Sequence, residues 1–264
     1  MDLSIRVEHL TMAFGSFVLM RDLNFAIRRG EIFIIIGGSG SGKSTLLRHL
    51  MGLQEPASGE VFYGDRSFTR ADPEARQEML RRVGVCYQGG ALFSSMTLAE
   101  NVALPLGEYT PLAPNELRRV AKTKLALVGL SGFEDFEPSN ISGGMQKRAA
   151  LARAMALDPE ILFLDEPSAG LDPITARRLD ELILELRASL GATVVVVTHE
   201  LASIFAIGDA CVLLDAAAHL SGRCNCYVTL NAVNPALLAH ANNRIIEYIE
   251  HTTKLQEERT RLTG

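Results

Sequence analysis

The sequence predicts an α/β fold, in which a mostly parallel β-sheet is covered by helices on both faces. Short apolar runs without polar alternation are typical of strands buried on both sides, and five such runs occur in the chain. Helix-like segments follow several of them, and this alternation of strand and helix is typical of α/β domains. The runs are 32–36, 83–87, 161–164, 193–197 and 211–214, and two of the helix-like segments are 43–52 and 173–190.

Two regions depart from this alternation. Before residue 31, apolar and polar residues alternate as they do in short antiparallel strands with one buried face. From about residue 95 to 156 there is no strand-like run, and Leu117, Ala121, Leu125 and Val128 recur at helical spacing. We therefore expect a helical insert between two segments of the sheet.

Length and composition indicate one large domain with room for a subdomain. The chain has 264 residues, of which 47% are hydrophobic and 22% are charged, as is ordinary for a globular protein. The formal net charge of −5 argues against a nucleic-acid partner, because nucleic-acid-binding proteins are usually basic. The cysteines are too few and too irregularly spaced for a disulfide framework, so we expect reduced thiols at Cys86, Cys211, Cys224 and Cys226.

The sequence also bears on where the protein works. It contains no run of about 18 apolar residues, so no membrane-spanning helix is expected. The first residues, MDLSIRVEHL, lack the charged start, apolar stretch and cleavage site of a signal peptide. We therefore expect the protein to stay in the cytosol.

Residues 37–45, GGSGSGKST, have the pattern of a phosphate-binding loop between a strand and a helix. Glycines allow successive backbone N–H groups to face phosphates, while Lys43 would reach the β- and γ-phosphates and Ser44 would ligate Mg²⁺. The bare pattern arises by chance in about one chain in a hundred of this length, and the strand and helix around it lower that frequency. We predict an ATP and Mg²⁺ site formed by Gly37, Gly38, Ser39, Gly40, Ser41, Gly42, Lys43, Ser44 and Thr45.

Polar side chains follow three other predicted strands. Asp165 and Glu166 end the run ILFLDE, Gln88 follows the second run, and His199 follows TVVVVT. In open α/β sheets, ligands bind at the carboxyl ends of the strands. Asp165 and Gln88 are suited to Mg²⁺, Glu166 to orienting or deprotonating a water, and His199 to donating to the γ-phosphate.

A second candidate anion site lies in NISGGMQKRAALARA, residues 140–154. A serine and two glycines precede a basic helix, and free N–H groups at a helix start bind anions. Ser142, Gly143 and Gly144 would therefore hold a phosphate, although the chain already has a phosphate loop about a hundred residues earlier.

These motifs, in this order, resemble the nucleotide-binding subunit of ATP-binding cassette (ABC) transporters over about residues 5–215. The resemblance rests on the phosphate loop, Gln88, the signature ISGGM at 141–145, ILFLDEP at 161–167, SAGLD at 168–172 and His199. Phe14 precedes Lys43 at about the distance at which this family places an aromatic residue that stacks on adenine.

The resemblance implies a P-loop NTPase fold with a RecA-like parallel core, an N-terminal antiparallel β subdomain and an α-helical subdomain. It implies an ABC ATPase domain at 1–220 and a C-terminal helical extension at 221–264. It also implies a head-to-tail pair of subunits, in which Ser142, Gly143 and Gly144 of one copy hold the γ-phosphate of the nucleotide bound by the other. Two half-sites in one chain would then give two shared ATP sites.

Further residues resemble the ATPase of the Mla-type phospholipid transporters. The family commonly has Gln at the fifth signature position, and this chain has Met145; YQGGALFSSMTLAENVALPL and DPIT at 172–175 match the same group. The resemblance implies a permease that docks near Gln88–Met96, a periplasmic lipid-binding subunit of the MCE type and a small cytosolic regulatory subunit of the STAS type. It implies a peripheral position at the cytoplasmic face of a Gram-negative inner membrane.

Three alternatives remain open from sequence. The chain could serve an importer of a small polar solute, or be a soluble ABC ATPase of iron–sulfur cluster assembly, which would not copurify with a membrane protein. Leu92, Phe93 and Met96 could pack the core of the helical insert instead of forming a docking socket.

Overall fold

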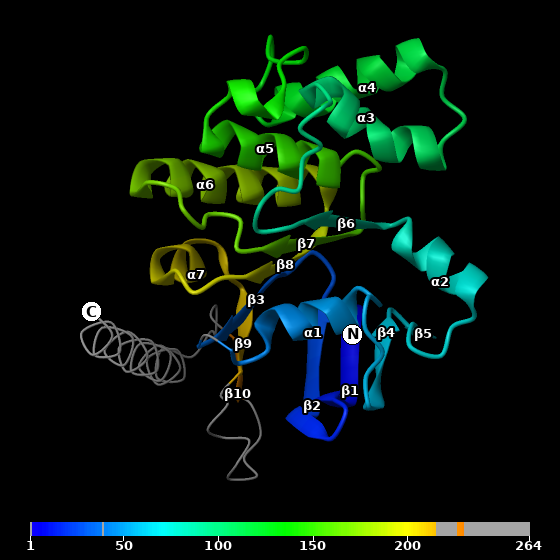
Figure 1. The fold of residues 1–264 in the computed structure, drawn as a ribbon. Coiled ribbons are helices and arrows are strands. Elements are labelled where there is room, and N and C mark those ends of the chain that lie inside the picture. Colours follow the sequence, from blue (N-terminus) through cyan, green and yellow to red (C-terminus); the bar gives the residue numbers. More distant parts are fainter. Residues whose placement is uncertain (1, 39, 215–225, 230–264) are drawn as a thin grey trace.

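The computed structural model describes residues 2–38, 40–214 and the backbone of 226–229. Its central feature is a six-stranded sheet with the order β10-β9-β3-β8-β7-β6 (Figure 1). Five of these strands are parallel, as predicted, and β10 pairs antiparallel with β9. The strands are β3 (Ile32–Gly37), β6 (Val83–Cys86), β7 (Ile161–Asp165), β8 (Thr193–Val197), β9 (Ala210–Leu214) and β10 (Cys226–Thr229).

A second, four-stranded antiparallel sheet has the order β2-β1-β4-β5. The antiparallel strands expected before residue 31 are present, but each has 12 residues and is longer than expected. The pairing of β1 with β2 continues over this length through several register shifts. Two later strands and helix α2 (Pro73–Leu80) were not predicted. The strands are β1 (Leu3–Phe14), β2 (Phe17–Arg28), β4 (Ser58–Tyr63) and β5 (Arg66–Ser67).

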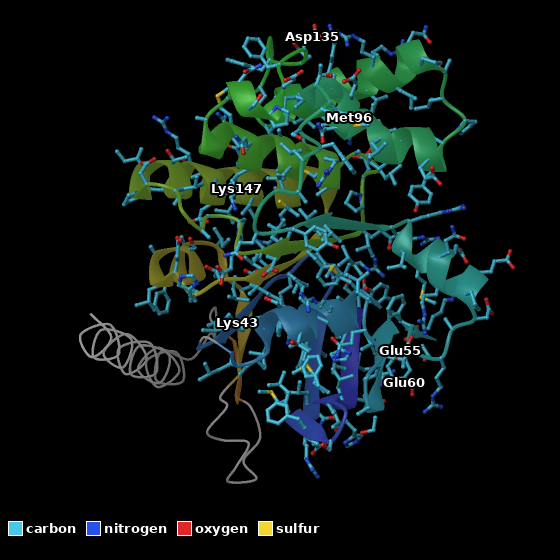
Figure 2. The ribbon with its side chains drawn as sticks, in the orientation of Figure 1. Lys43, Glu55, Glu60, Met96, Asp135 and Lys147 are labelled. Carbon is cyan, nitrogen blue, oxygen red and sulfur yellow. The ribbon has the colours of Figure 1, made fainter. Side chains whose placement is uncertain are left out.

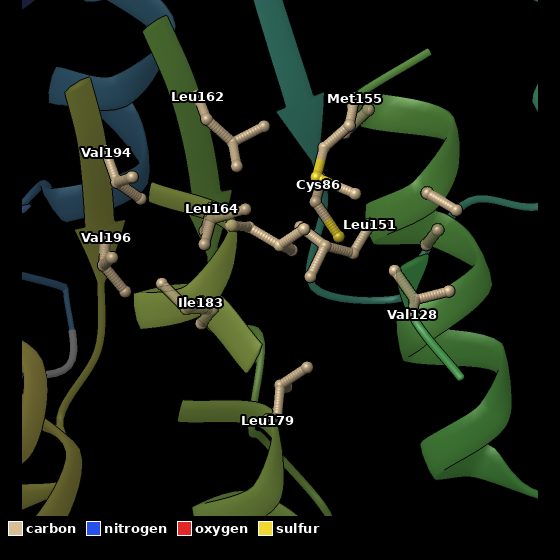
Figure 3. Close-up of a cluster of buried hydrophobic side chains, with 14 of the residues drawn as sticks. Cys86, Val128, Leu151, Met155, Leu162, Leu164, Leu179, Ile183, Val194 and Val196 are labelled. Carbon is tan, nitrogen blue, oxygen red and sulfur yellow. The ribbon is translucent and has the colours of Figure 1, made fainter. Parts of the chain in front are cut away.

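The parallel strands are buried on both faces because successive residues point to opposite sides of the sheet. On β3, Ile34 packs in one hydrophobic cluster and Phe33 in the other. Helices α5 (Gly143–Ala154) and α6 (Pro173–Leu190) cover the first face, and α1 (Lys43–Leu50) with the antiparallel sheet covers the second (Figure 1). Figure 3 shows part of the first cluster, including Cys86, Val128, Leu151, Met155, Leu162, Leu164, Leu179, Ile183, Val194 and Val196.

The region between β6 and β7 is helical, as the absence of strand-like runs indicates. It contains α3 (Leu98–Tyr109), α4 (Pro114–Leu127), the 3-10 turn Pro138–Asn140 and α5. The hydroxyl of Thr97 accepts the N–H of Glu100, and the Glu100 carboxylate accepts the N–H of Thr97, a capping box that fixes the start of α3. Ala121 and Leu125 of α4 are buried, as their helical spacing predicts.

The range expected to form a C-terminal helical extension, 221–264, contains the strand β10. Its pairing with β9 extends the sheet past residue 220, and the rest of that range lies outside the described residues. The division of the chain at residue 220 stays a prediction. Within the described ranges, none of the helices combines the length and apolar composition that a membrane span requires.

Candidate nucleotide site

The phosphate loop joins β3 to α1 by a sharp turn. Gly40 and Gly42 have φ angles of 77° and 96°, a region that residues with a Cβ rarely adopt. The N–H of Ser41 donates to the carbonyl of Gly38 at 3.2 Å, and that of Leu46 donates to the carbonyl of Gly42 at 2.7 Å. The turn therefore leads directly into the helix. Ser39, a predicted member of the site, lies outside the described residues.

Gly37 is required by close packing. A Cβ added there would lie 2.3 Å from Ser41 Oγ and 2.7 Å from the carbonyl oxygen of Leu214. No side chain fits that space, so the end of β3 lies tightly against the end of β9.

The Lys43 side chain is held by backbone carbonyls of the phosphate loop. Its Nζ donates to the carbonyl oxygens of Gly37 at 2.8 Å and Gly38 at 3.0 Å. Burial lowers the pKa of this half-buried amine, and the negative charges of Glu166 and Asp165 act against that change. On the same first turn of α1, Ser44 is exposed and Thr45 is half-buried.

Two carboxylates end β7. Burial raises the pKa of the half-buried Asp165, the charge of Glu166 adds to this, and Lys43 opposes it. Glu166 has a φ angle of 46°, which is uncommon for a residue other than glycine, and its N–H donates to the Val197 carbonyl at 2.8 Å. Such unfavourable conformations concentrate at functional sites.

The carboxylate of Glu166 joins the ends of three neighbouring strands. Gln88 Nε2 donates to Glu166 Oε2 at 2.9 Å, and His199 Nδ1 lies 3.2 Å from Glu166 Oε1. These residues follow β6, β7 and β8, which are adjacent in the sheet. The Glu166 side chain is 18% exposed and that of His199 is 61% exposed, so both are open to a ligand at this edge.

The predicted Mg²⁺ ligands fit a hard cation by their chemistry, because Ser44, Gln88 and Asp165 each provide an oxygen atom. Among the described residues there is no group of three or more His, Cys, Asp or Glu side chains that would bind a metal alone. A Mg²⁺ ion at this edge would therefore need phosphate oxygens and water as further ligands.

The second candidate anion site stands at the start of α5. Ser142 caps this helix by accepting the N–H of Met145 at 3.3 Å, and Ser142 and Gly143 are exposed. A Cβ on Gly144 would lie 2.8 Å from Thr175 Cγ2, so the first turn of α5 packs on the first turn of α6. Because α5 and α1 cover opposite faces of the sheet, the two anion sites of one chain also lie on opposite faces (Figure 1).

The start of α6 follows the segment SAGLD. Asp172 caps the helix by accepting the N–H groups of Ile174 and Thr175, each at 3.1 Å, and the Thr175 hydroxyl at 2.6 Å. These hydrogen bonds, led by that of the hydroxyl, lower the pKa of Asp172. The hydroxyl of Thr175 thus contacts Asp172, and its methyl group lies against Gly144 of the signature.

Comparison with known proteins decides the family. The profile of the ABC transporter family matches residues 20–169, more than half of the chain. The chain belongs to this family. The sequence prediction of its family and fold is therefore confirmed.

Relatives within the ABC family differ in what their names say they transport. "Probable ribonucleotide transport ATP-binding protein mkl" of Mycobacterium tuberculosis H37Rv is 43% identical over 201 residues, which are 76% of this chain and 56% of the relative. "Intermembrane phospholipid transport system ATP-binding protein MlaF" of Haemophilus influenzae is 40% identical over 205 residues, 78% of each chain. MlaF of Escherichia coli K12 is 40% identical over 195 residues, 74% of this chain and 72% of the relative. The chain thus spans little more than half the length of the mycobacterial relative.

Solved structures of other ABC cassettes have the same fold. One is a dimeric, post-hydrolysis ATP-binding cassette bound to ADP and Pi, which is 30% identical, has a TM-score of 0.76, and is matched over 86% of this chain and 99% of that one. The fold and sequence together support nucleotide binding by this chain.

Phe14, the predicted adenine contact of this chain, lies at the end of β1. Phe14 is 50% exposed. Met12, two residues earlier, and Leu19 of β2 lie next to the phosphate loop, because a Cβ on Gly42 would meet Leu19 Cδ2 at 2.8 Å and Met12 Cε at 3.4 Å. The antiparallel sheet therefore brings an exposed aromatic ring to the neighbourhood of the loop.

The loop after Gln88 is held by side chains that the sequence analysis did not single out. Lys147 Nζ donates to the Gln88 carbonyl, and Arg153 donates to the carbonyls of Gly90 at 2.8 Å and Ala91 at 2.7 Å. Figure 2 shows Lys147 on α5 and Lys43 on α1, on opposite sides of the six-stranded sheet. The loop is therefore attached to the helical insert.

Asn101 of α3 completes this attachment. It is fully buried, its Oδ1 accepts the N–H of Phe93 at 2.8 Å, and its Nδ2 donates to the carbonyls of Phe93 at 3.0 Å and Met96 at 3.2 Å. A sequence signal for Asn101 existed, because this polar residue stands between the apolar residues Leu98 and Val102 on the buried side of α3. A buried amide needs hydrogen-bond partners.

A groove of about 560 Å³ opens beside this loop. The groove is lined by Phe93, Leu104 and Tyr109, which are 50%, 42% and 44% exposed, respectively. Leu92 packs against the hydrophobic core and Met96 is half-buried. The packing of Leu92 therefore agrees with the core interpretation, Phe93 faces the groove, and the docking socket stays a prediction.

Proposed function

We propose that this chain is the ATP-hydrolysing subunit of an ABC transporter that moves phospholipids between the inner and outer membranes of a Gram-negative bacterium. The meeting of Lys43, Asp165 and Glu166 with Gln88 and His199 at one edge of the sheet supports ATP hydrolysis. The identity of 40% with two MlaF proteins supports a phospholipid substrate.

Each residue of the site has a proposed role in ATP binding or hydrolysis. The N–H groups of residues 37–45 and the amine of Lys43 bind the β- and γ-phosphates, and Phe14 stacks on adenine. Mg²⁺, held by Ser44, Asp165 and Gln88, would neutralise phosphate charge when bound. Glu166 orients or deprotonates the attacking water, and His199 donates a hydrogen bond to the γ-phosphate.

Two copies of the chain complete the site in this proposal. Ser142, Gly143 and Gly144 lie on the opposite face of the sheet from their own phosphate loop, so they are available to the partner's nucleotide. The related cassette bound to ADP and Pi is also a dimer. ATP closes the head-to-tail pair, and hydrolysis releases it.

The other proposed partners follow from the groove and the family. A short cytoplasmic helix of a permease docks near Gln88–Met96, where Phe93 and Tyr109 offer an apolar surface. A periplasmic MCE-type subunit carries lipid, and a STAS-type regulatory subunit binds the helical insert. The chain is then a peripheral protein on the cytoplasmic face of the inner membrane, without a nucleic-acid partner.

One alternative substrate has an observation in its favour. The mycobacterial relative, at 43% identity, is named for ribonucleotide transport, and a ribonucleotide is a small polar solute. An importer of such a solute would use the same ATP site with a different permease.

The test is to isolate the tagged chain from its native membranes in mild detergent and to identify bound proteins and lipids by mass spectrometry. A multi-span permease with a periplasmic lipid-binding subunit and bound phospholipid is the expected result. A permease accompanied by a solute-binding protein would support the alternative, and a soluble partner alone would contradict both transport proposals.

A further inference from the structure

A buried hydrogen bond outside the nucleotide site joins α6 to α7 (Leu201–Ile207). Ser203 Oγ donates to Asp180 Oδ2 at 2.8 Å, and the two residues are 3% and 6% exposed. Nothing in the chemistry proposed above uses either side chain. The bond nevertheless lies close in sequence to that chemistry, because α7 begins two residues after His199.

Burying the Asp180 carboxylate at this position is energetically unfavourable. Its neighbours on α6, Leu179 and Ile183, belong to the hydrophobic cluster between the sheet and the helices. Burial raises the pKa of Asp180, the carboxylates of Glu200 and Glu181 add to the rise, and only the hydrogen bond of Ser203 opposes it. An apolar residue would fill the same space at lower cost, so a specific contact explains the aspartate better than packing does.

The segment that holds His199 depends on anchors at both of its ends. On one side, the buried Thr198 donates its N–H to the Ile35 carbonyl at 3.4 Å and accepts the N–H of Glu200 at 3.1 Å. On the other side stands α7, whose seven residues are too few for a helix that is stable alone. The place of α7 therefore depends on tertiary packing: Ile204 and Ile207 lie in the hydrophobic cluster, and the Ser203 hydroxyl makes a buried polar contact with α6.

We propose that Asp180 and Ser203 are positioning residues that hold α7 so that the His199 ring stays within reach of Glu166 and the γ-phosphate. The inference rests on the role proposed for His199. It assigns no contact with substrate to either residue. Loss of the bond would let the start of α7 shift, and a displacement of about 1 Å at a catalytic group lowers rates about a hundredfold.

The test compares three variants of the full chain. Asp180→Asn keeps an acceptor for the Ser203 hydroxyl, whereas Asp180→Leu removes it and keeps the bulk of the side chain. Thr193→Ala is the matched control, because the buried Thr193 accepts the N–H of Gly30 with its Oγ1 at 3.0 Å at the opposite end of β8. ATP hydrolysis gives kcat and KM, and the imidazole NMR resonance of His199, assigned with His199→Ala, reports its surroundings without nucleotide.

We expect Asp180→Leu to lower kcat about 10- to 100-fold with KM for ATP changed less than about threefold, and to shift the His199 resonance. Asp180→Asn and Thr193→Ala should keep both the rate and the resonance near those of the wild type. If Asp180→Leu fails to fold, Ser203→Ala removes the same bond from the other side and should give the same pattern.

The inference is overturned if the His199 resonance stays in place in Asp180→Leu or Ser203→Ala, or if Thr193→Ala has an equal effect. It is also overturned if Asp180→Leu slows the residual hydrolysis of His199→Ala by as much as it slows the wild type, since a residue that acts through His199 has no effect without it. These failures differ from failure of the proposed function, in which the wild-type chain itself would not hydrolyse ATP.

Discussion

Glu166 shows how much of this molecule is decided by single residues. Its carboxylate accepts a hydrogen bond from Gln88 and contacts His199, and its backbone has a φ angle that side chains disfavour. The hydrogen bond from Gln88 and the N–H that Glu166 donates to the Val197 carbonyl hold it in that conformation.

Glu166→Gln should retain ATP binding and lower hydrolysis about 100-fold or more, because the amide keeps the shape but cannot take a proton from water. Nucleotide affinity by fluorescence titration and phosphate release by a continuous assay would check this. Hydrolysis at the wild-type rate would show that another group activates the water.

The two signature glycines are alike in sequence but not in structure. A Cβ on Gly143 would meet no atom within 4 Å, whereas one on Gly144 would lie 2.8 Å from Thr175 Cγ2. Gly144→Ala should therefore lower the free energy of unfolding by about 1–3 kcal/mol, and Gly143→Ala should cost much less. Thermal unfolding without nucleotide measures both.

Thr175→Ser provides a further control for this pair, because it removes the methyl group that Gly144→Ala would overlap and keeps the hydroxyl that donates to Asp172. It should restore most of the stability lost by Gly144→Ala. Equal costs for the two glycine substitutions would contradict the packing of α5 on α6.

Asp165 should make the nucleotide-free protein less stable than it could be. Its pKa is raised, first by burial and then by Glu166, so its ionised form is disfavoured in the folded state. Asp165→Asn should raise the free energy of unfolding at pH 7.5 by about 1 kcal/mol and abolish hydrolysis.

The pH dependence of this difference has a fixed sign. As the pH falls through the raised pKa, Asp165 becomes neutral in the folded wild type, so the advantage of Asp165→Asn should shrink. Chemical denaturation at several pH values tests it. An advantage that grows as the pH falls would contradict the assigned cause.

At the scale of elements, the loop after β6 belongs with the helices rather than with the sheet. Lys147 and Arg153 of α5 and Asn101 of α3 hold its carbonyls, while Gln88 at its start donates to Glu166. A movement of the helical insert would therefore be transmitted to the nucleotide site through Gln88.

Asn101→Ala should lower the free energy of unfolding by about 1–3 kcal/mol, because it leaves the partly buried N–H and carbonyl of Phe93 without their partner. Hydrogen exchange of residues 88–97 should accelerate. Thr123→Ala, an exposed change in α4, should alter stability by less than about 0.5 kcal/mol and leave this exchange unchanged. Unchanged exchange in Asn101→Ala would show that the loop is held by other contacts.

The sequence predicted the elements that have one dominant signal. The buried strands β3, β7, β8 and β9 are continuous apolar runs, and α6 has the predicted bounds of 173–190, because Asp172 and Pro173 mark its start and Gly191 its end. The strands β4 and β5 and helix α2 were missed. Their burial is partial, and the two strands depend on pairing, β4 with β1 and β5 with β4, which no local pattern records.

The candidate site was predictable in part for the same reason. The phosphate loop, Asp165 and Glu166 follow local motifs, and the meeting of Gln88, Glu166 and His199 follows from strands ending at one edge. Arg153 and the Asp180–Ser203 bond were not found, because each depends on a contact between separate elements. Asn101 was missed although its partners lie at most eight residues away along the chain.

At the scale of the whole molecule, the chain carries two halves of an anion site on opposite faces of one sheet. Neither half is complete in one copy under the proposed function. A second copy, related by a two-fold axis, would bring each half to its complement.

The most direct test of this account mixes two variants of the full chain that each break a different half-site. Lys43→Ala removes the cation at the phosphate loop and Ser142→Arg obstructs the signature, so each homodimer should be inactive. Random mixing makes half of the dimers mixed, each with one intact site, so the account predicts about a quarter of the wild-type ATP hydrolysis. No recovery of hydrolysis, with mixed dimers verified by two-tag purification, would contradict it.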